Sequence, residues 1–206
     1  MKAAFLLVAC AVLAAGCTTP PPENEARREA QAVFERSFTH GNQEMFARVV
    51  GQDEVQALCS RYRNQPPADV AERIEKSQAA TIVYPEDGKL MGDWRMGEKI
   101  AEDGFGLRFT DTGQPNRPNG GNCYACHRLA PHELSYGTLG PSLYRFGSTR
   151  GSGEAMQRYV YGKVYNSQAF TACSGMPRFG YHKVLTPEQI KHVVALLLDP
   201  ESPVNK

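Results

Sequence analysis

The order of apolar and polar positions predicts a protein built from helices. From residue 24 to residue 50, apolar side chains recur three or four positions apart, as they do on one face of a helix. A further helix is predicted after Pro67, which suits a first helical turn and is followed by Val70 and Ile74. We therefore expect a helical N-terminal extension over residues 24–90.

The C-terminal half predicts two more helices around a loop. Asp93 is a good N-cap for a helix that carries Met96, and Thr186 and Pro187 begin a C-terminal helix. Residues 110–122 are rich in Gly and Pro and predict a loop. The apolar stripe of the last helix is wide: Ile190, Val193, Val194, Leu196, Leu197 and Leu198. Because no strand pattern is found, the predicted fold class is all-α.

The N-terminus resembles a bacterial export signal. Lys2 is followed by an apolar run that is too short to span a bilayer. Small residues then precede Cys17, which predicts a lipoprotein-type signal peptide over residues 1–16 and a lipid on Cys17. The Pro-rich residues 17–23 suit an extended tether. The alternative is ordinary cleavage near Ala15. Either outcome places the mature chain in the periplasm, with or without a lipid anchor.

Composition narrows the function classes. The chain has 206 residues, of which 41% are hydrophobic and 22% charged, so a packed core is expected rather than disorder. Lys and Arg number 23 and Asp and Glu 22, for a net charge of +1. This balance argues against binding to nucleic acid, because proteins that bind nucleic acid usually carry a strong excess of Lys and Arg.

Cys123, Cys126 and His127 form a C-x-x-C-H sequence, the attachment signature of c-type haem. Two thiols three positions apart can reach the two vinyl groups of one porphyrin, and the adjacent imidazole can ligate the iron. One covalent haem c is therefore expected. The alternative is a redox-active C-x-x-C of the thioredoxin type. Such a motif normally lies near a β-α-β pattern, which the sequence lacks.

Met176 is the predicted second axial ligand of the haem iron. It lies in a polar, Gly-rich stretch and is followed by Pro177, unlike a methionine that fills a core. Other candidates for this ligand are Met156, His132, His182 and His192.

Gly140 and Pro141 follow the haem motif at the position where small cytochromes c support the ligating histidine. We expect the Pro141 carbonyl to accept a hydrogen bond from the His127 imidazole, which would fix its tautomer. Gly140 would permit the close approach of the backbone.

Five stretches are more specific than the haem motif alone: Gly120–His127, Ser135–Leu143, Tyr165–Ser167, Met176–Gly180 and Leu197–Asn205. Together they resemble the SoxX family, the monohaem cytochrome c subunits of thiosulfate-oxidising SoxAX complexes. The resemblance covers roughly residues 53–206. It implies a class I cytochrome c-like domain over residues 91–206.

The resemblance also implies partners. A SoxA-type cytochrome subunit would carry the catalytic haem, so this chain would supply no catalytic residue. The pair would couple thiosulfate oxidatively to a cysteine of the carrier SoxYZ, and the present chain would accept the electrons and pass them to a downstream cytochrome. The alternative is a freestanding periplasmic electron-shuttle cytochrome.

In the predicted mature chain, Cys59 and Cys173 remain once the haem pair and Cys17 are assigned. In an oxidising compartment we expect them to form a disulfide that joins the extension to the loop of Met176. In the alternative, Cys173 is a thiolate ligand or a reactive nucleophile.

Overall fold

The computed structural model describes residues 23–39, 47, 50–106, 108, 111 and 116–206. These residues form helices, turns and loops, and no β-strand occurs among them, in agreement with the all-α prediction. The predicted signal peptide and Cys17 lie outside the described residues. The chain divides into two compact units, residues 1–39 and residues 40–206.

The first unit contains one described helix, α1 (Glu23–Ser37). None of its residues is buried, so the apolar face that the sequence predicts is exposed. Phe34 and Phe38 stack on each other with ring centroids 5.9 Å apart. The helix begins at the last residue of the expected tether.

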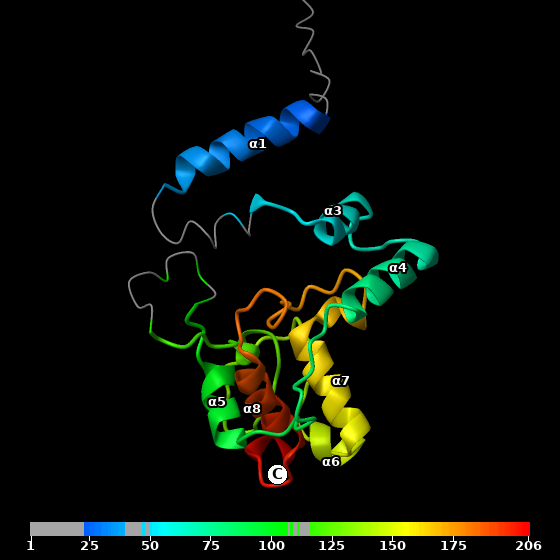
Figure 1. Cartoon of the computed structure of the whole chain (residues 1–206). Helices are drawn as coiled ribbons and strands as arrows, with labels where there is room; N and C mark the ends of the chain where they lie inside the picture. The colour runs from blue at the N-terminus through cyan, green and yellow to red at the C-terminus, as the bar shows by residue number, and fades with distance from the viewer. Residues whose placement is uncertain (1–22, 40–46, 48–49, 107, 109–110, 112–115) are drawn as a thin grey trace, which may run out of the picture. The chain divides into compact units, whose positions relative to one another are not determined.

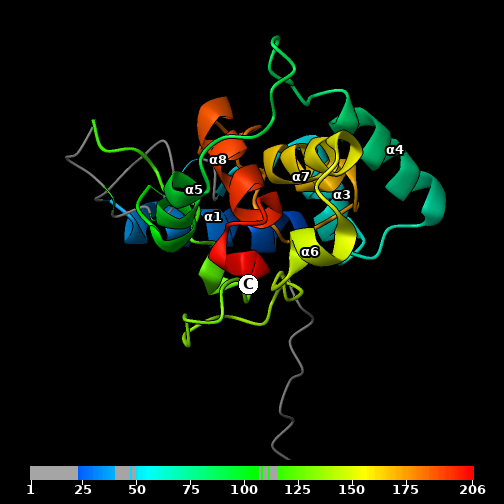
Figure 2. The same ribbon diagram turned by 90° about the horizontal axis from the view of Figure 1, so that it is seen from below.

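The second unit contains the remaining described elements. Its helices are α3 (Glu54–Arg61), α4 (Ala68–Ala79), α5 (Trp94–Glu102), α6 (Phe146–Arg150), α7 (Glu154–Tyr165) and α8 (Pro187–Leu198). Three short 3₁₀ turns join them: η1 (Cys123–Ala125), η2 (Ser167–Ala169) and η3 (Pro203–Asn205). Helix α8 lies between α5 and α7 in both views of the ribbon (Figures 1 and 2).

Helix α8 forms the centre of the main core. Thr186 caps it through a capping box with Gln189, and Pro187 occupies its first turn, as the sequence predicts. Helix α5 crosses α8 closely at Gly97, where a Cβ atom would lie 2.1 Å from the carbonyl oxygen of His192. Asp93 caps α5, as the sequence predicts, and Met96 of this helix is 43% exposed.

Helices α3 and α4 pack within the second unit rather than apart from it. The unit of residues 40–206 thus takes in α3 and α4 of the expected extension together with the expected cytochrome domain. A small core cluster joins the two helices: Val55, Cys59, Val70 and Ile74. Cys59 forms a disulfide with Cys173, with the two Cα atoms 5.4 Å apart.

A partly buried ion pair also links α3 to the C-terminal half. The carboxylate of Asp53 caps α3 by accepting a hydrogen bond of 2.8 Å from the Gln56 N–H. Its other oxygen pairs with the guanidinium of Arg178, which is buried and stacks on the ring of Tyr181. Burial alone would raise the pKa of Asp53. The Gln56 N–H, Arg178 and the charge of His182 outweigh that effect and hold the pKa below its ordinary value of 3.8.

Replacement of Asp53 by Asn is expected to lower the free energy of unfolding at neutral pH by about 2 kcal/mol, because Arg178 loses its counter-charge. Asn still caps the helix, so the variant isolates the ion pair. Because the folded-state pKa of Asp53 is depressed, the stabilisation is complete above the unfolded pKa and is lost as pH falls through the folded pKa. Denaturant unfolding at a series of pH values should therefore show the two proteins converging below pH 4. A gap that is constant with pH would contradict this assignment.

Candidate functional site

The C-x-x-C-H sequence forms a tight turn at the start of η1. Asn122 begins the turn in the left-handed region, at a φ of 46°. The N–H groups of Cys126 and His127 both donate to the carbonyl of Cys123, over 3.1 and 2.9 Å. This turn brings Cys123, Cys126 and His127 onto one short segment, and both thiols are free.

The environment of Cys123 differs from that of a redox-active thiol. Burial of its sulfur and the neighbouring Cys126 thiol raise the pKa of Cys123 to about 12. Reactive C-x-x-C motifs have a lowered thiol pKa, because the thiolate is the attacking species. The buried Cys123 thiol therefore differs from the attacking thiol of a thioredoxin-type pair.

His127 is held in one orientation. Its Nδ1 atom lies 2.7 Å from the carbonyl oxygen of Pro141, which is the hydrogen bond predicted from the sequence for this proline. Since a carbonyl only accepts, Nδ1 carries the proton, and Nε2 keeps its lone pair for a metal. A Cβ atom at Gly140 would lie 2.2 Å from Cε1 of His127. Only glycine leaves room for the imidazole at this point.

Met176 lies in the loop between η2 and α8. Its side chain is half-buried and packs against the main core cluster, as does Cys123. The Ser167 hydroxyl donates a hydrogen bond of 2.7 Å to the Met176 carbonyl, and the Met176 N–H donates one of 3.3 Å to the Ser174 hydroxyl. The hydroxyl groups of Ser167 and Ser174 therefore hold the carbonyl and the N–H of Met176.

The rival ligands have other contacts. Met156 lies in the first turn of α7 and packs against the main core. The Nδ1 atom of His192 accepts a hydrogen bond of 2.9 Å from the Asp93 N–H, which leaves that nitrogen no lone pair for iron. His132 lies 3.7 Å from the carboxylate of Glu98. The ring of His182 contacts that of Tyr181.

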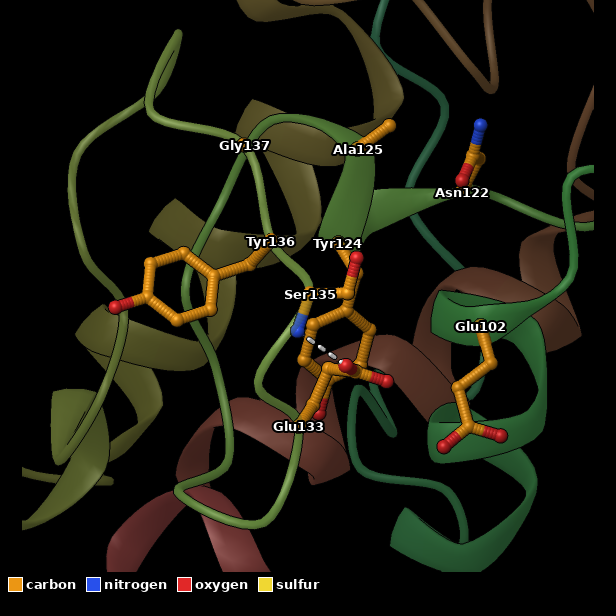
Figure 3. A pocket seen from close by; sticks show the side chains of 8 residues that line it. All are labelled: Glu102, Asn122, Tyr124, Ala125, Glu133, Ser135, Tyr136 and Gly137. Carbon is orange, nitrogen blue, oxygen red and sulfur yellow. Dashed lines mark hydrogen bonds between the residues drawn. The ribbon is translucent and has the colours of Figure 1, made fainter.

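A cleft of about 380 Å³ lies beside the attachment turn (Figure 3). Figure 3 shows Glu102 of α5 and Glu133, from the loop between η1 and α6, around the ring of Tyr124. Burial and the carboxylates of Glu102, Glu98 and Glu133 raise the pKa of the Tyr124 hydroxyl. Neither His127 nor Met176 lines this cleft, so it is separate from the predicted haem ligands.

A buried polar network beside Met176 is not predicted by the sequence. Its members are Gln78, Asn166 and Arg178, which are 6%, 0% and 4% exposed. The side-chain oxygen of Gln78 accepts hydrogen bonds from Asn166 and Arg178, each over 3.0 Å. Asn166 and Arg178 fall within stretches that carry the SoxX resemblance. Nothing local in the sequence indicates that Gln78, in a helix far upstream, joins them.

Comparison with known proteins identifies a relative of similar length. No protein-family model matches the chain. A protein of Aquifex aeolicus (strain VF5), described as an uncharacterized lipoprotein, is 38% identical over 204 residues, which cover 94% of this chain and 95% of the relative. Among the described residues, no helix combines the length and apolar character that crossing a membrane requires. Identity at this level over almost the full length shows common descent, and the chain belongs to the same family as the Aquifex aeolicus lipoprotein.

Proposed function

We propose that this chain is a c-type cytochrome that carries one covalent haem and accepts electrons during thiosulfate oxidation, as a SoxX-type subunit. Cys123 and Cys126 hold the haem through thioethers, and His127 and Met176 ligate its iron. The expected cytochrome c-like domain, residues 91–206, supplies all four groups. The observation that carries the proposal is the His127–Pro141 hydrogen bond at the attachment turn, which leaves Nε2 available to a metal.

The residues present fit a covalently held haem. Two free thiols and an oriented imidazole lie on one tight turn, and Gly140 leaves the space that the imidazole needs. Thiols, an imidazole and a thioether are the donor set of a His/Met c-type centre. Because the pKa of Cys123 is raised, little of this thiol is present as thiolate, and spontaneous exchange with disulfides is disfavoured. This is compatible with a thiol that adds to a vinyl group only with the aid of a haem maturation system.

The chain's own residues set how the centre would work. When bound, the haem supplies reversible one-electron transfer at its iron. The Pro141 carbonyl fixes the tautomer of His127 and makes the imidazole a more basic ligand. A thioether from Met176 favours the reduced state, which suits an acceptor of electrons. Because His127 and Met176 would both be iron ligands, thiosulfate would have no site on the iron, and we assign the sulfur chemistry to a partner.

The proposed setting is the periplasm, with the mature chain tethered by a lipid on Cys17. The lipoprotein relative supports this, since it aligns with 94% of the chain. The proposed partners are a SoxA-type cytochrome subunit, the carrier SoxYZ through that complex, and a downstream acceptor cytochrome.

A haem-stained denaturing gel of the chain, produced with a c-type haem maturation system, tests the cofactor. We expect one covalent haem per chain and no staining in the Cys123→Ala/Cys126→Ala variant, because each thioether needs one thiol. His192→Gln is a control, since that imidazole lies outside the proposed ligand set. Staining that survives loss of both cysteines would refute the proposal.

A pull-down from native membranes tests the partner. A second haem-staining subunit should copurify with the chain, and the pair, rather than the chain alone, should oxidise thiosulfate in the presence of the carrier. Isolation of the chain without any haem partner would favour the freestanding shuttle.

A further inference from the structure

We propose that Gln78, in the N-terminal extension, is the positioning residue for Met176. The inference rests on the proposed haem function and names a residue that positions the proposed ligand Met176 through other residues. Gln78 lies near the end of α4, outside the expected cytochrome domain, and is 6% exposed.

Gln78 contacts the chain on both sides of Met176. Its side-chain oxygen accepts a hydrogen bond of 3.0 Å from Nδ2 of Asn166, the residue directly before Ser167. The same oxygen accepts another of 3.0 Å from Nη1 of Arg178, two residues after Met176. Ser167 in turn donates a hydrogen bond to the Met176 carbonyl. One oxygen of Gln78 therefore holds the chain both before and after Met176.

The two donors have no freedom to move away. Asn166 is fully buried, and its amide also donates to the Thr81 hydroxyl over 2.9 Å. Arg178 is 4% exposed, and its charge is compensated by Asp53 from the cap of α3. Removal of the Gln78 side-chain oxygen would take the buried acceptor from Nη1 of Arg178 and leave the Asn166 amide only Thr81 and a 3.5 Å contact with the Gln78 main-chain carbonyl. The desolvation cost of these weakened contacts favours rearrangement of the loop.

Further contacts from the extension reach the start of the same loop. The Ala172 N–H donates to the carboxylate of Glu75 over 3.0 Å, and Cys173 is joined to Cys59. These contacts hold the loop's beginning, three or four residues before Met176. Gln78 contacts residues on both sides of Met176 in the sequence. Its replacement is therefore the most direct test of the role of the extension.

The test compares two replacements of Gln78 in the haem-loaded full chain. Gln78→Met keeps the length and removes the acceptor, whereas Gln78→Glu keeps an acceptor oxygen. Loss of the acceptor should remove at least about half of the near-infrared charge-transfer band of sulfur-ligated ferric haem and lower the reduction potential, because a thioether stabilises the ferrous state. Gln78→Glu should retain the band. Asn205→Leu is a control, since it removes three side-chain hydrogen bonds at the far end of α8.

The outcomes separate this inference from the proposed function. If the parent chain carries haem but lacks the band, the ligand itself is wrong. If the parent shows the band and Gln78→Met keeps it at full strength with an unchanged potential, the role of Gln78 is overturned and the function stands. A band lost equally in Asn205→Leu would also overturn it, as a general effect of stability. Should Gln78→Met fail to accumulate, Asn166→Leu tests the same contact from the donor side, because it removes the amide that donates to the Gln78 side-chain oxygen, and an unchanged band and potential would again overturn the inference.

Discussion

Replacement of Met176 by Ala is expected to abolish the near-infrared charge-transfer band of the oxidised protein while the haem remains covalently attached. The Met176 thioether is the proposed sulfur ligand, whereas the covalent bonds to the porphyrin come from the separate turn at Cys123 and Cys126. The reduction potential should fall, because a thioether favours the ferrous state. Absorption spectroscopy and a redox titration measure both effects.

Met156→Ala is the matched control for this prediction. Met156 is also half-buried against the main core, so its loss costs comparable packing. The control should keep the band and the potential. A band that persists in Met176→Ala and disappears in Met156→Ala would transfer the ligand role to α7.

Replacement of Cys59 and Cys173 together by Ala is expected to lower the free energy of unfolding by about 4–5 kcal/mol. The bridge spans 114 residues, and a crosslink over such a distance removes much of the conformational freedom of the unfolded chain. A loss of this size is roughly a third to all of the stability of an ordinary domain. Denaturant unfolding of the oxidised parent and the double variant measures the difference.

Reduction of the parent by a dithiol provides the control, because it opens the same bridge without changing the sequence. The reduced parent and the double variant should unfold at similar denaturant concentrations. Mass analysis of an unreduced digest should find the peptides of Cys59 and Cys173 joined. Two free thiols in the purified protein would favour the alternative, in which Cys173 is a reactive thiol.

Local signals in the sequence predict much of the fold. The cap at Thr186 with Pro187 marks the start of α8, and Pro67 with Val70 and Ile74 marks α4, because caps and apolar spacing act within one or two helical turns. The same reasoning fails where burial depends on distant elements. Val33 and Phe34 have the spacing of a buried face and are 51% and 44% exposed. Nothing within α1 itself determines what covers that face.

The candidate site divides in the same way. Cys123, Cys126 and His127 lie within five consecutive positions, so the sequence alone indicates their chemistry. Gln78 and Arg178 are a hundred positions apart, and a polar residue in a helix ordinarily predicts a solvated position. Their burial follows from the packing of α4 beside η2, which no local pattern encodes.

The order of the cysteines along the chain constrains how the protein matures. Among the four cysteines in the described residues, the partner of Cys59 is the last to be synthesised, and Cys123 and Cys126 lie between the two. Any oxidation before Cys173 emerges can only join Cys59 to a wrong thiol or close the C-x-x-C pair. The native crosslink thus requires nearly the whole chain, or a later exchange through a thiolate. A covalent group on Cys123 and Cys126 would remove the two thiols that compete with Cys173 for Cys59. The order in which this group and the disulfide form would therefore determine which disulfide the mature protein contains.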